Sequence, residues 1–204
     1  KDGTIQDNIT DWALNQFQIN YPDLTITKRD IFNYVYAVLH DPKYIRKYAL
    51  NLQAEFPRIP FHPQFHAWAN IGSQLIQLHA YFEQVIPWQL KRVELATPNN
   101  ASPKCRLKAD KTANIIELDT NTRLEGIPPQ AWEYQLGNRS ALEWVLDQYK
   151  EKVPRDPTIR DKFNTYRFAE HKEHVIELLA KVCQVSVETI RLVAELSALD
   201  TPDL

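Results

Sequence analysis

The strongest constraint on the fold of this chain is the helix punctuation near its amino end. Thr27 followed by Asp30 forms a capping-box pattern, which also places a carboxylate near the positive end of a helix. Apolar residues then recur with the spacing of one helical face: Ile31, Tyr34, Val35, Val38 and Leu39. The pattern predicts an amphipathic helix whose apolar face belongs to a core.

A second helix is predicted directly after the first. Asp41 followed by Pro42 is an N-cap with a first-turn proline, and we expect the helix to run to about Glu55. Pro57 and Pro60 then end it. Further helical patterns start near residue 10 and cover residues 63–85, so the amino-terminal part of the chain is predicted to be helical.

The character of the sequence changes after residue 88. Four short segments with partial alternation predict strands, over residues 89–96, 104–109, 113–118 and 122–127. Pro129 then opens a short helix, Ser140 with Glu143 caps another, and two closing helices follow a polar loop over residues 150–168. We therefore predict an α+β fold with a helical N-terminal part, a small central antiparallel sheet and C-terminal helices. The predicted division is a helical subdomain over residues 1–88 and an α+β subdomain over residues 89–204.

Three blocks of sequence resemble the C-terminal target recognition domain of type ISP restriction-modification enzymes. They are the segment from Thr27 to Phe61, GIPPQAWEYQLGNRSALEWVLDQY (residues 126–149) and VSVETIRLVAEL (residues 185–196). The similarity extends from about Ile9 to Leu196 and is weakest over residues 91–121. Three long blocks in the same order make the resemblance specific.

The resemblance implies sequence-specific recognition of double-stranded DNA for a linked adenine-N6 DNA methyltransferase. In such enzymes nuclease, helicase-like and methyltransferase domains precede this domain in one polypeptide, so those domains are the expected partners. The resemblance implies no chemistry for the domain itself. S-adenosylmethionine, ATP and Mg are therefore expected only in the parent chain, and no cofactor is expected here. The sequence agrees, since it contains no phosphate loop, dinucleotide fingerprint, nucleophile elbow or zinc-finger spacing.

Composition adds two expectations. The chain has no methionine and starts at Lys1, which predicts a fragment of a longer polypeptide. Cys105 and Cys183 have no metal-ligand spacing around them, so we expect free thiols in a reducing cytoplasm. No apolar run is long enough to span a membrane.

The net charge of −2 does not by itself indicate nucleic-acid binding, but the charges are segregated along the chain. Basic residues concentrate in two stretches, and they are the candidate DNA-binding residues: Lys91, Arg92, Lys104, Arg106, Lys108, Lys111, Arg155, Arg160 and Arg167. Solvated loops would produce the same charge pattern. Strand alternation would put Lys104, Arg106 and Lys108 on one face, with Arg106 suited to a base and Lys108 to a phosphate.

Other residues allow competing interpretations. His62 and His66 have the spacing of two metal ligands on a helix, but Pro63 stands where a metalloprotease needs glutamate, so we expect ordinary surface histidines. The tyrosines of the helix pair could stack on DNA bases that are flipped out of the duplex, but we favour the interpretation that their rings pack within the helical part. Arg58 is interpreted as a phosphate anchor, a contact to a neighbouring domain or a helix cap. The main alternative function is a protein-interaction or scaffold module that docks onto a motor or methyltransferase domain, and a free-standing hydrolase is a third.

Overall fold

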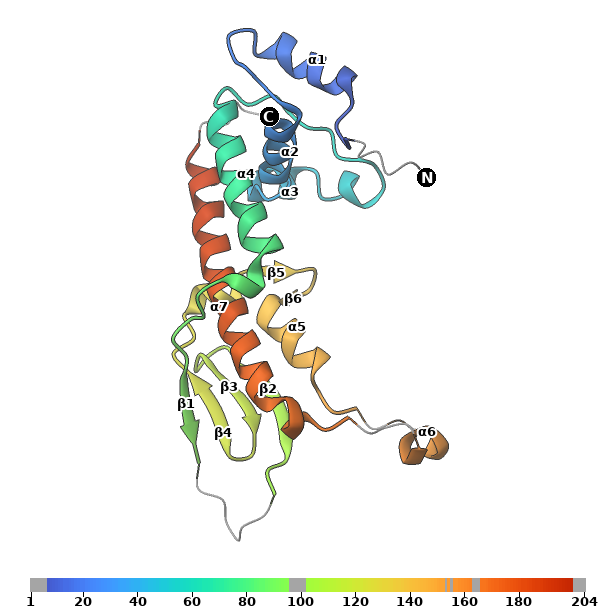
Figure 1. Ribbon diagram of the computed structural model, residues 1–204, viewed down its shortest axis with the longest axis vertical. Helices are drawn as coiled ribbons and strands as arrows, with labels where there is room; N and C mark the ends of the chain where they lie inside the picture. The colour runs from blue at the N-terminus through green and yellow to red at the C-terminus, as the bar shows by residue number, and fades with distance from the viewer. Residues whose placement is uncertain (1–6, 96–101, 153, 155, 163–165, 200–204) are drawn as a thin grey trace. The chain divides into compact units, whose positions relative to one another are not determined.

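The computed structural model describes residues 7–95, 102–152, 154, 156–162 and 166–199. The chain divides into two compact units, which we describe separately. Unit 1 comprises residues 1–80 with residues 191–204, and unit 2 comprises residues 81–190. The predicted α+β class is confirmed, with helices at both ends of the chain and a small antiparallel sheet between them (Figure 1).

Unit 1 consists of short helices. Its elements are α1 (Asp11–Asn20), α2 (Lys28–Val38), α3 (Pro42–Lys47), the 3-10 turn η1 (Asn51–Gln53) and α4 (Phe65–Ala80). The capping box is present as predicted: the amide of Asp30 donates to the Thr27 hydroxyl, and the amide of Thr27 donates to the Asp30 carboxylate. Asp41 caps α3 by accepting hydrogen bonds from the backbone amides of Lys43 and Tyr44.

The second helix is shorter than the sequence predicted. It ends at Lys47 and not near Glu55, because Tyr48 leaves helical geometry and Asn51–Gln53 form only a 3-10 turn. Leu50 is 81% exposed, so its side chain adds no buried contact that would support a longer helix.

The core of unit 1 forms where α2 packs against α4. The predicted face of α2 is correct, since Ile31, Tyr34 and Val38 are buried while Leu39 is only partly so. Gly72 of α4 allows the closest approach: a Cβ at this position would lie 1.9 Å from the carbonyl oxygen of Asn33. The glycine is therefore required by packing, because any side chain would push the two helices apart.

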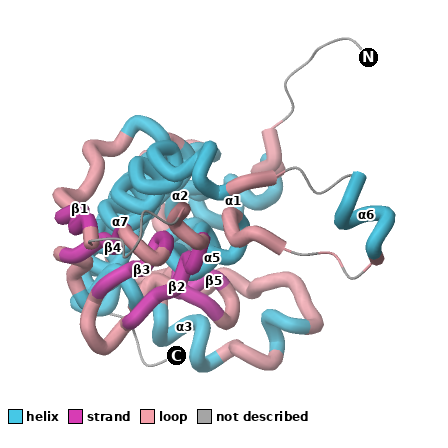
Figure 2. The backbone as a smooth tube through the Cα atoms, turned by 90° about the horizontal axis from the view of Figure 1, so that it is seen from below, coloured by secondary structure: helices cyan, strands magenta, loops and turns pink. Residues whose placement is uncertain are grey.

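Unit 2 is built on a four-stranded antiparallel sheet. Its strands are β1 (Lys91–Glu94), β2 (Cys105–Asp110), β3 (Ile115–Asp119) and β4 (Thr122–Glu125), in the order β1-β4-β3-β2 (Figure 2). Unit 2 also contains the turns η2 (Phe82–Gln84) and η4 (Pro129–Trp132), the two-residue strands β5 (Gln135–Leu136) and β6 (Arg139–Ser140), and the helices α5 (Ala141–Gln148) and α6 (Pro157–Lys162). Ser140 and Glu143 form the predicted capping box of α5.

The closing part of the chain is one helix, where the sequence predicted two. α7 runs without interruption from Phe168 to Ala198, and its residues are divided between the two units. Neither glycine nor proline occurs in this stretch, and the hydroxyl of Ser186 donates to the carbonyl of Val182 one turn earlier, so nothing breaks the helix. Among the described residues, no helix combines the length and apolar character that crossing a bilayer requires.

Candidate nucleic-acid interface

One face of the unit 2 sheet is covered and the other carries charge. The covered face packs on α5 and α7 through a cluster of buried apolar side chains: Leu107, Ile116, Leu118, Leu124, Leu142, Leu146, Val175, Leu179 and Cys183. Side chains alternate between the two faces of a strand, so the opposite face of the sheet carries Glu117 of β3 together with Arg123 and Glu125 of β4. All three are partly exposed. The predicted pattern of a charged face backed by a core is therefore present.

The charged face is a ladder of opposite charges across the four strands. Arg106 of β2 lies 3.0 Å from the Glu117 carboxylate, and Glu117 pairs in register with Arg123. Arg123 in turn lies 2.7 Å from Glu125, which is 3.3 Å from the Lys91 ammonium of β1. We call these five residues the charge ladder. The hydrogen bond from Lys91, together with that from Arg123, holds the pKa of the Glu125 carboxyl below its usual range.

Arg123 is a member of this ladder that the sequence interpretation missed. The signal was available, because alternation within Thr122–Glu125 puts Arg123 and Glu125 on one face and Leu124 on the other. The ladder has three cations and two carboxylates. Its cations can contact DNA only by sharing or exchanging the carboxylates that they already bind.

The strand that carries most of the predicted contacts is irregular. The register of β2 against β3 shifts by one residue between Cys105 and Lys108, and Leu107 adopts the left-handed conformation with φ of 42°. This is a β-bulge, which bends the strand and turns its side chains. Burial still alternates, with Leu107 buried and Arg106 and Lys108 exposed. Lys108 lies opposite Glu117 in the strand register and Arg106 lies 3.0 Å from the same carboxylate, so both cations remain on the charged face.

Two other predicted DNA contacts form ion pairs with helices of unit 2. Arg92 pairs in register with the buried Leu124, and its guanidinium lies 2.8 Å from Glu173 of α7, on the covered side of the sheet. Lys111 lies 2.9 Å from Glu143 of α5. Both residues therefore join the sheet to a helix, and neither belongs to the charge ladder.

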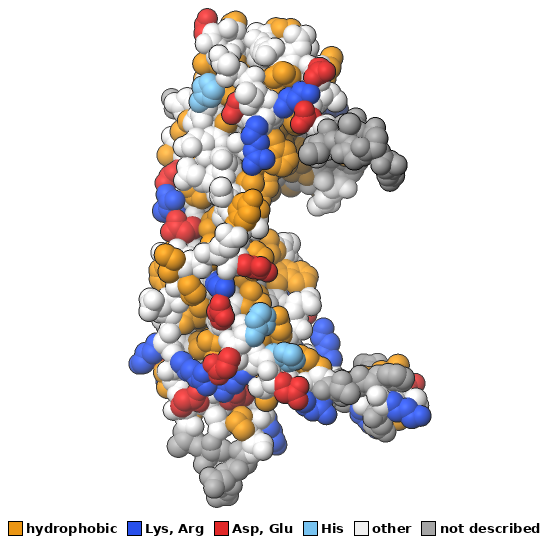
Figure 3. Space-filling view, viewed as in Figure 1, with side chains coloured by type: hydrophobic (Ala, Val, Ile, Leu, Met, Phe, Trp, Pro, Cys, Tyr) orange, Lys and Arg blue, Asp and Glu red, His pale blue; other side chains and the backbone are white. Residues whose placement is uncertain are grey.

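The remaining predicted contacts are scattered. Lys104 precedes β2 and has an exposed side chain, Arg160 lies on α6, and Arg167 lies just before α7. Arg155 lies outside the described residues. Basic and acidic side chains are interspersed over the visible face of unit 2 and do not form a field of one sign (Figure 3).

A buried ion network fixes the end of the sheet where β3 turns into β4. Lys172 of α7 lies 2.9 Å from Asp119, whose side chain is 4% exposed, and it also donates to the hydroxyl of Thr122. The other carboxylate oxygen of Asp119 accepts from the backbone amides of Asn121 and Thr122. Burial alone would raise the pKa of Asp119, but the bond from Lys172 and these amides outweigh it and hold that pKa below its usual range.

The tyrosines of unit 1 pack as favoured above. Tyr34 and Tyr44 are buried, and their hydroxyls donate to the carbonyls of Pro60 and Arg58. Their rings are thus unavailable for stacking on a base.

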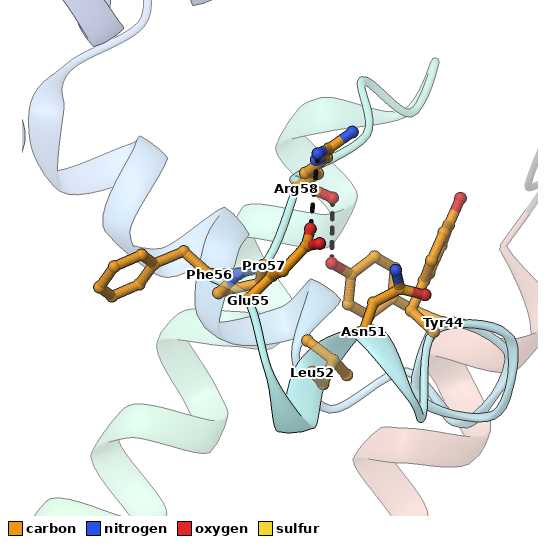
Figure 4. A pocket seen from close by; sticks show the side chains of 8 residues that line it. Tyr44, Asn51, Leu52, Glu55, Phe56, Pro57 and Arg58 are labelled. Carbon is orange, nitrogen blue, oxygen red and sulfur yellow. Dashed lines mark hydrogen bonds and ion pairs between the residues drawn. The ribbon is translucent and has the colours of Figure 1, made fainter.

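Arg58 itself points outward beside a small pocket of about 160 Å³ (Figure 4). Its guanidinium lies 3.4 Å from the carboxylate of Glu55, three residues earlier in the chain. The neighbouring Phe56 is 96% exposed. The side chains of Phe56 and Arg58 both reach solvent, and they point in different directions (Figure 4).

The histidine expectation was wrong in one respect. His62 precedes α4 as predicted, but it is buried and not on the surface, and its ring stacks on Trp68 at 4.2 Å between centroids. Burial lowers its pKa, against the opposing charge of Asp41. Within the described ranges, no three His, Cys, Asp or Glu side chains gather closely enough to hold a metal ion.

Comparison with known proteins identifies a family. The model of the type ISP C-terminal specificity domain matches residues 1–178 of this chain. No curated protein sequence matches the chain.

Three solved structures are similar to this chain. The cryo-EM structure of a DrdV–DNA complex has 54% sequence identity over 95% of this chain, with a TM-score of 0.88. A nuclease-deletion mutant of the type ISP restriction-modification enzyme LlaGI, in complex with a DNA substrate mimic, has 30% identity over 87% of this chain, with a TM-score of 0.67. The ATP-dependent type ISP enzyme LlaBIII bound to DNA has 25% identity over 95%, with a TM-score of 0.70. This chain covers only 20%, 17% and 12% of those three chains, respectively.

Proposed function

Because this chain belongs to the family of type ISP C-terminal specificity domains, we propose that it recognises a specific DNA sequence for a restriction-modification enzyme. The observation that carries the proposal is the 54% identity, over 95% of this chain, to part of a protein whose structure was solved with DNA. The two type ISP enzymes at lower identity were also solved with DNA or a DNA mimic. In this proposal the linked domains of the same polypeptide include an adenine-N6 methyltransferase and a helicase-like motor.

The charged face of the unit 2 sheet supports the proposal. A two-stranded ribbon or sheet can enter the major groove, where Arg and Lys read guanine. Arg106 and Arg123 stand at the centre of the charge ladder, and Glu117 lies between them. A carboxylate at this position can accept a hydrogen bond from the amino group of cytosine, so the ladder offers both kinds of base reader.

The first test is the salt dependence of duplex binding. We expect the affinity of the 204-residue chain for double-stranded DNA to fall linearly on a log–log plot against salt concentration. The slope is about −0.9 for each phosphate neutralised, so several contacts produce a steep line. Fluorescence anisotropy with a labelled duplex at four salt concentrations measures it. A flat line, or no binding at low salt, would contradict the proposal.

The proposal assigns no chemistry to this part of the polypeptide. We expect no methyltransferase, nuclease or ATPase activity from it, and no binding of S-adenosylmethionine, because the motifs for those reactions are absent from the sequence. Isothermal titration of the chain with S-adenosylmethionine is the direct measurement. Stoichiometric heat release would show that the assignment is wrong. We also place the protein in the cytoplasm, in keeping with the free thiols of Cys105 and Cys183.

A second candidate function has one observation in its favour. Leu50 and Phe56 of unit 1 are 81% and 96% exposed, which is unusual for large apolar side chains so close in sequence. They favour a docking role for unit 1, as a scaffold against another domain of the polypeptide. Replacing both by serine would weaken such docking and leave the salt dependence of DNA binding unchanged.

A further inference from the structure

A groove runs between the edge strand β2 and helix α5 in unit 2. It has a volume of about 250 Å³ and is lined by Leu107, Lys108, Ala109, Arg139, Glu143, Leu146, Asp147 and Lys150. Of its lining residues, Leu107 and Leu146 are buried, while Lys108 and Lys150 are exposed. The bulge at Leu107 shapes one wall, because it turns that side chain into the core while Lys108 remains exposed beside the groove.

The cations of this groove differ from those of the charge ladder. Every Arg and Lys of the ladder has a carboxylate within 3.3 Å. Lys108 and Lys150, in contrast, have no carboxylate partner among the described residues, and both are exposed. An anion can bind these two ammonium groups without breaking an existing ion pair, so no free energy is lost from a broken pair when it binds.

Arg139 is the third cation, and it is held in place. Its guanidinium lies 5.5 Å from the centre of the Trp144 ring and 3.2 Å from Asp147. Stacking on an aromatic ring fixes the plane of the guanidinium and leaves its edge for hydrogen bonding. Glu143, the other carboxylate of the groove, is already paired with Lys111 at 2.9 Å and also caps α5.

The ion pairs around the groove therefore leave two positive charges without a negative partner. Pairing Arg139 with Asp147 and Lys111 with Glu143 leaves Lys108 and Lys150 uncompensated on the rim of one groove. The chemistry that fits two ammonium groups and an oriented guanidinium is a phosphate diester backbone. Glu143 and Asp147 would repel peptide carboxylates and phosphates alike, so the choice of a phosphate backbone rests on the DNA-binding function proposed above.

We propose that this groove binds the phosphate backbone of the DNA, with Lys108, Arg139 and Lys150 as its contacts. The proposal rests on the proposed DNA-binding function and refines it. Backbone contacts at the β2 edge fix the register and orientation of the duplex, while the charge ladder contacts the bases. Arg139 and Lys150 thus join the interface, although neither is among the candidate DNA-binding residues named from the sequence.

The test is a double variant that removes both unpaired charges. In the Lys108→Gln, Lys150→Gln variant we expect the log–log salt slope of duplex binding to become shallower by about 2, near 0.9 for each lost contact. The affinity should fall equally for all sequences in a randomised duplex pool, because phosphate contacts carry no sequence information. A matched control, Lys47→Gln with Lys181→Gln, removes the same charge from other exposed or ion-paired positions and should leave the slope unchanged. Fluorescence anisotropy at several salt concentrations measures all three proteins.

Two further variants protect the test from effects on folding. Lys108→Arg with Lys150→Arg keeps both charges and should retain the wild-type slope. Asp147→Asn removes the carboxylate that competes for Arg139 and should tighten binding several-fold at low salt, a gain that unfolding cannot produce.

The outcomes separate the two proposals. If the wild-type chain shows no salt-dependent binding, the proposed DNA-binding function fails. If the wild type binds but the glutamine double variant keeps its slope, or changes no more than the control pair does, only the groove is wrong.

Discussion

Gly72→Ala should destabilise the helical unit by at least about 2 kcal/mol, although alanine favours a helix over glycine by about 1 kcal/mol. The added methyl group would lie 1.9 Å from the carbonyl oxygen of Asn33 and 2.7 Å from its carbonyl carbon. Both atoms belong to the backbone of α2, so no side-chain rotation can relieve the contact. The two helices must separate, and the buried rings beside them lose packing.

Chemical denaturation followed by circular dichroism measures this loss. Gln74→Ala, two residues further along α4 on its exposed side, is the control and should change the free energy of unfolding by less than about 0.5 kcal/mol. Equal stability of Gly72→Ala and the wild type would show that α2 and α4 are not in contact at this point.

Lys172→Ala should cost about 3 kcal/mol, near the lower end of the range for breaking a buried ion pair. Among the residues that the structure describes, the variant leaves the Asp119 carboxylate, which is 4% exposed, with two backbone amides as donors. Lys172 keeps 16% of its side-chain area in solvent, which is why we expect the lower end of the range. Lys181→Ala on the same helix breaks an ion pair whose carboxylate is 60% exposed, and it should cost below about 1 kcal/mol.

The deficit of Lys172→Ala should depend on pH in a defined direction. The folded-state pKa of Asp119 is below its ordinary value, so its contribution to stability is complete above the unfolded-state pKa and is lost as pH falls through the folded-state pKa. Removal of Lys172 raises the folded-state pKa. The difference between wild type and variant should therefore be largest near pH 7 and shrink in acid, below the ordinary aspartate pKa of about 3.9. A deficit that does not change with pH would mean that Lys172 acts by packing and not by charge.

Local sequence signals determined where most elements begin. The capping boxes at Thr27 and Ser140 and the N-cap with proline at Asp41 each act through atoms within a few residues, so the sequence alone identifies them. The buried face of α2 and the approximate positions of the four strands follow from periodicity for the same reason. The family resemblance also rested on order and spacing along the chain, and the match over residues 1–178 agrees with it.

Features that depend on contacts with residues distant in sequence could not be predicted from the sequence. The length of α3 and the continuity of α7 depend on what each segment packs against, and propensity alone misjudged both. The burial of His62 follows from its stacking on Trp68, which no local pattern reveals.

The candidate site shows the same limit. Basic residues cluster in the sequence between positions 91 and 111, yet Arg92 turns to α7, Lys111 to α5 and Arg106 to Glu117. Charge along a chain is a one-dimensional property, whereas the field that a ligand meets depends on which carboxylates the fold brings within a few ångströms. The sequence determined that this chain forms capped helices around a small sheet with cations on its strands. Only the tertiary structure decided which cations are neutralised and which remain available, because ion pairs form between residues that are far apart in sequence.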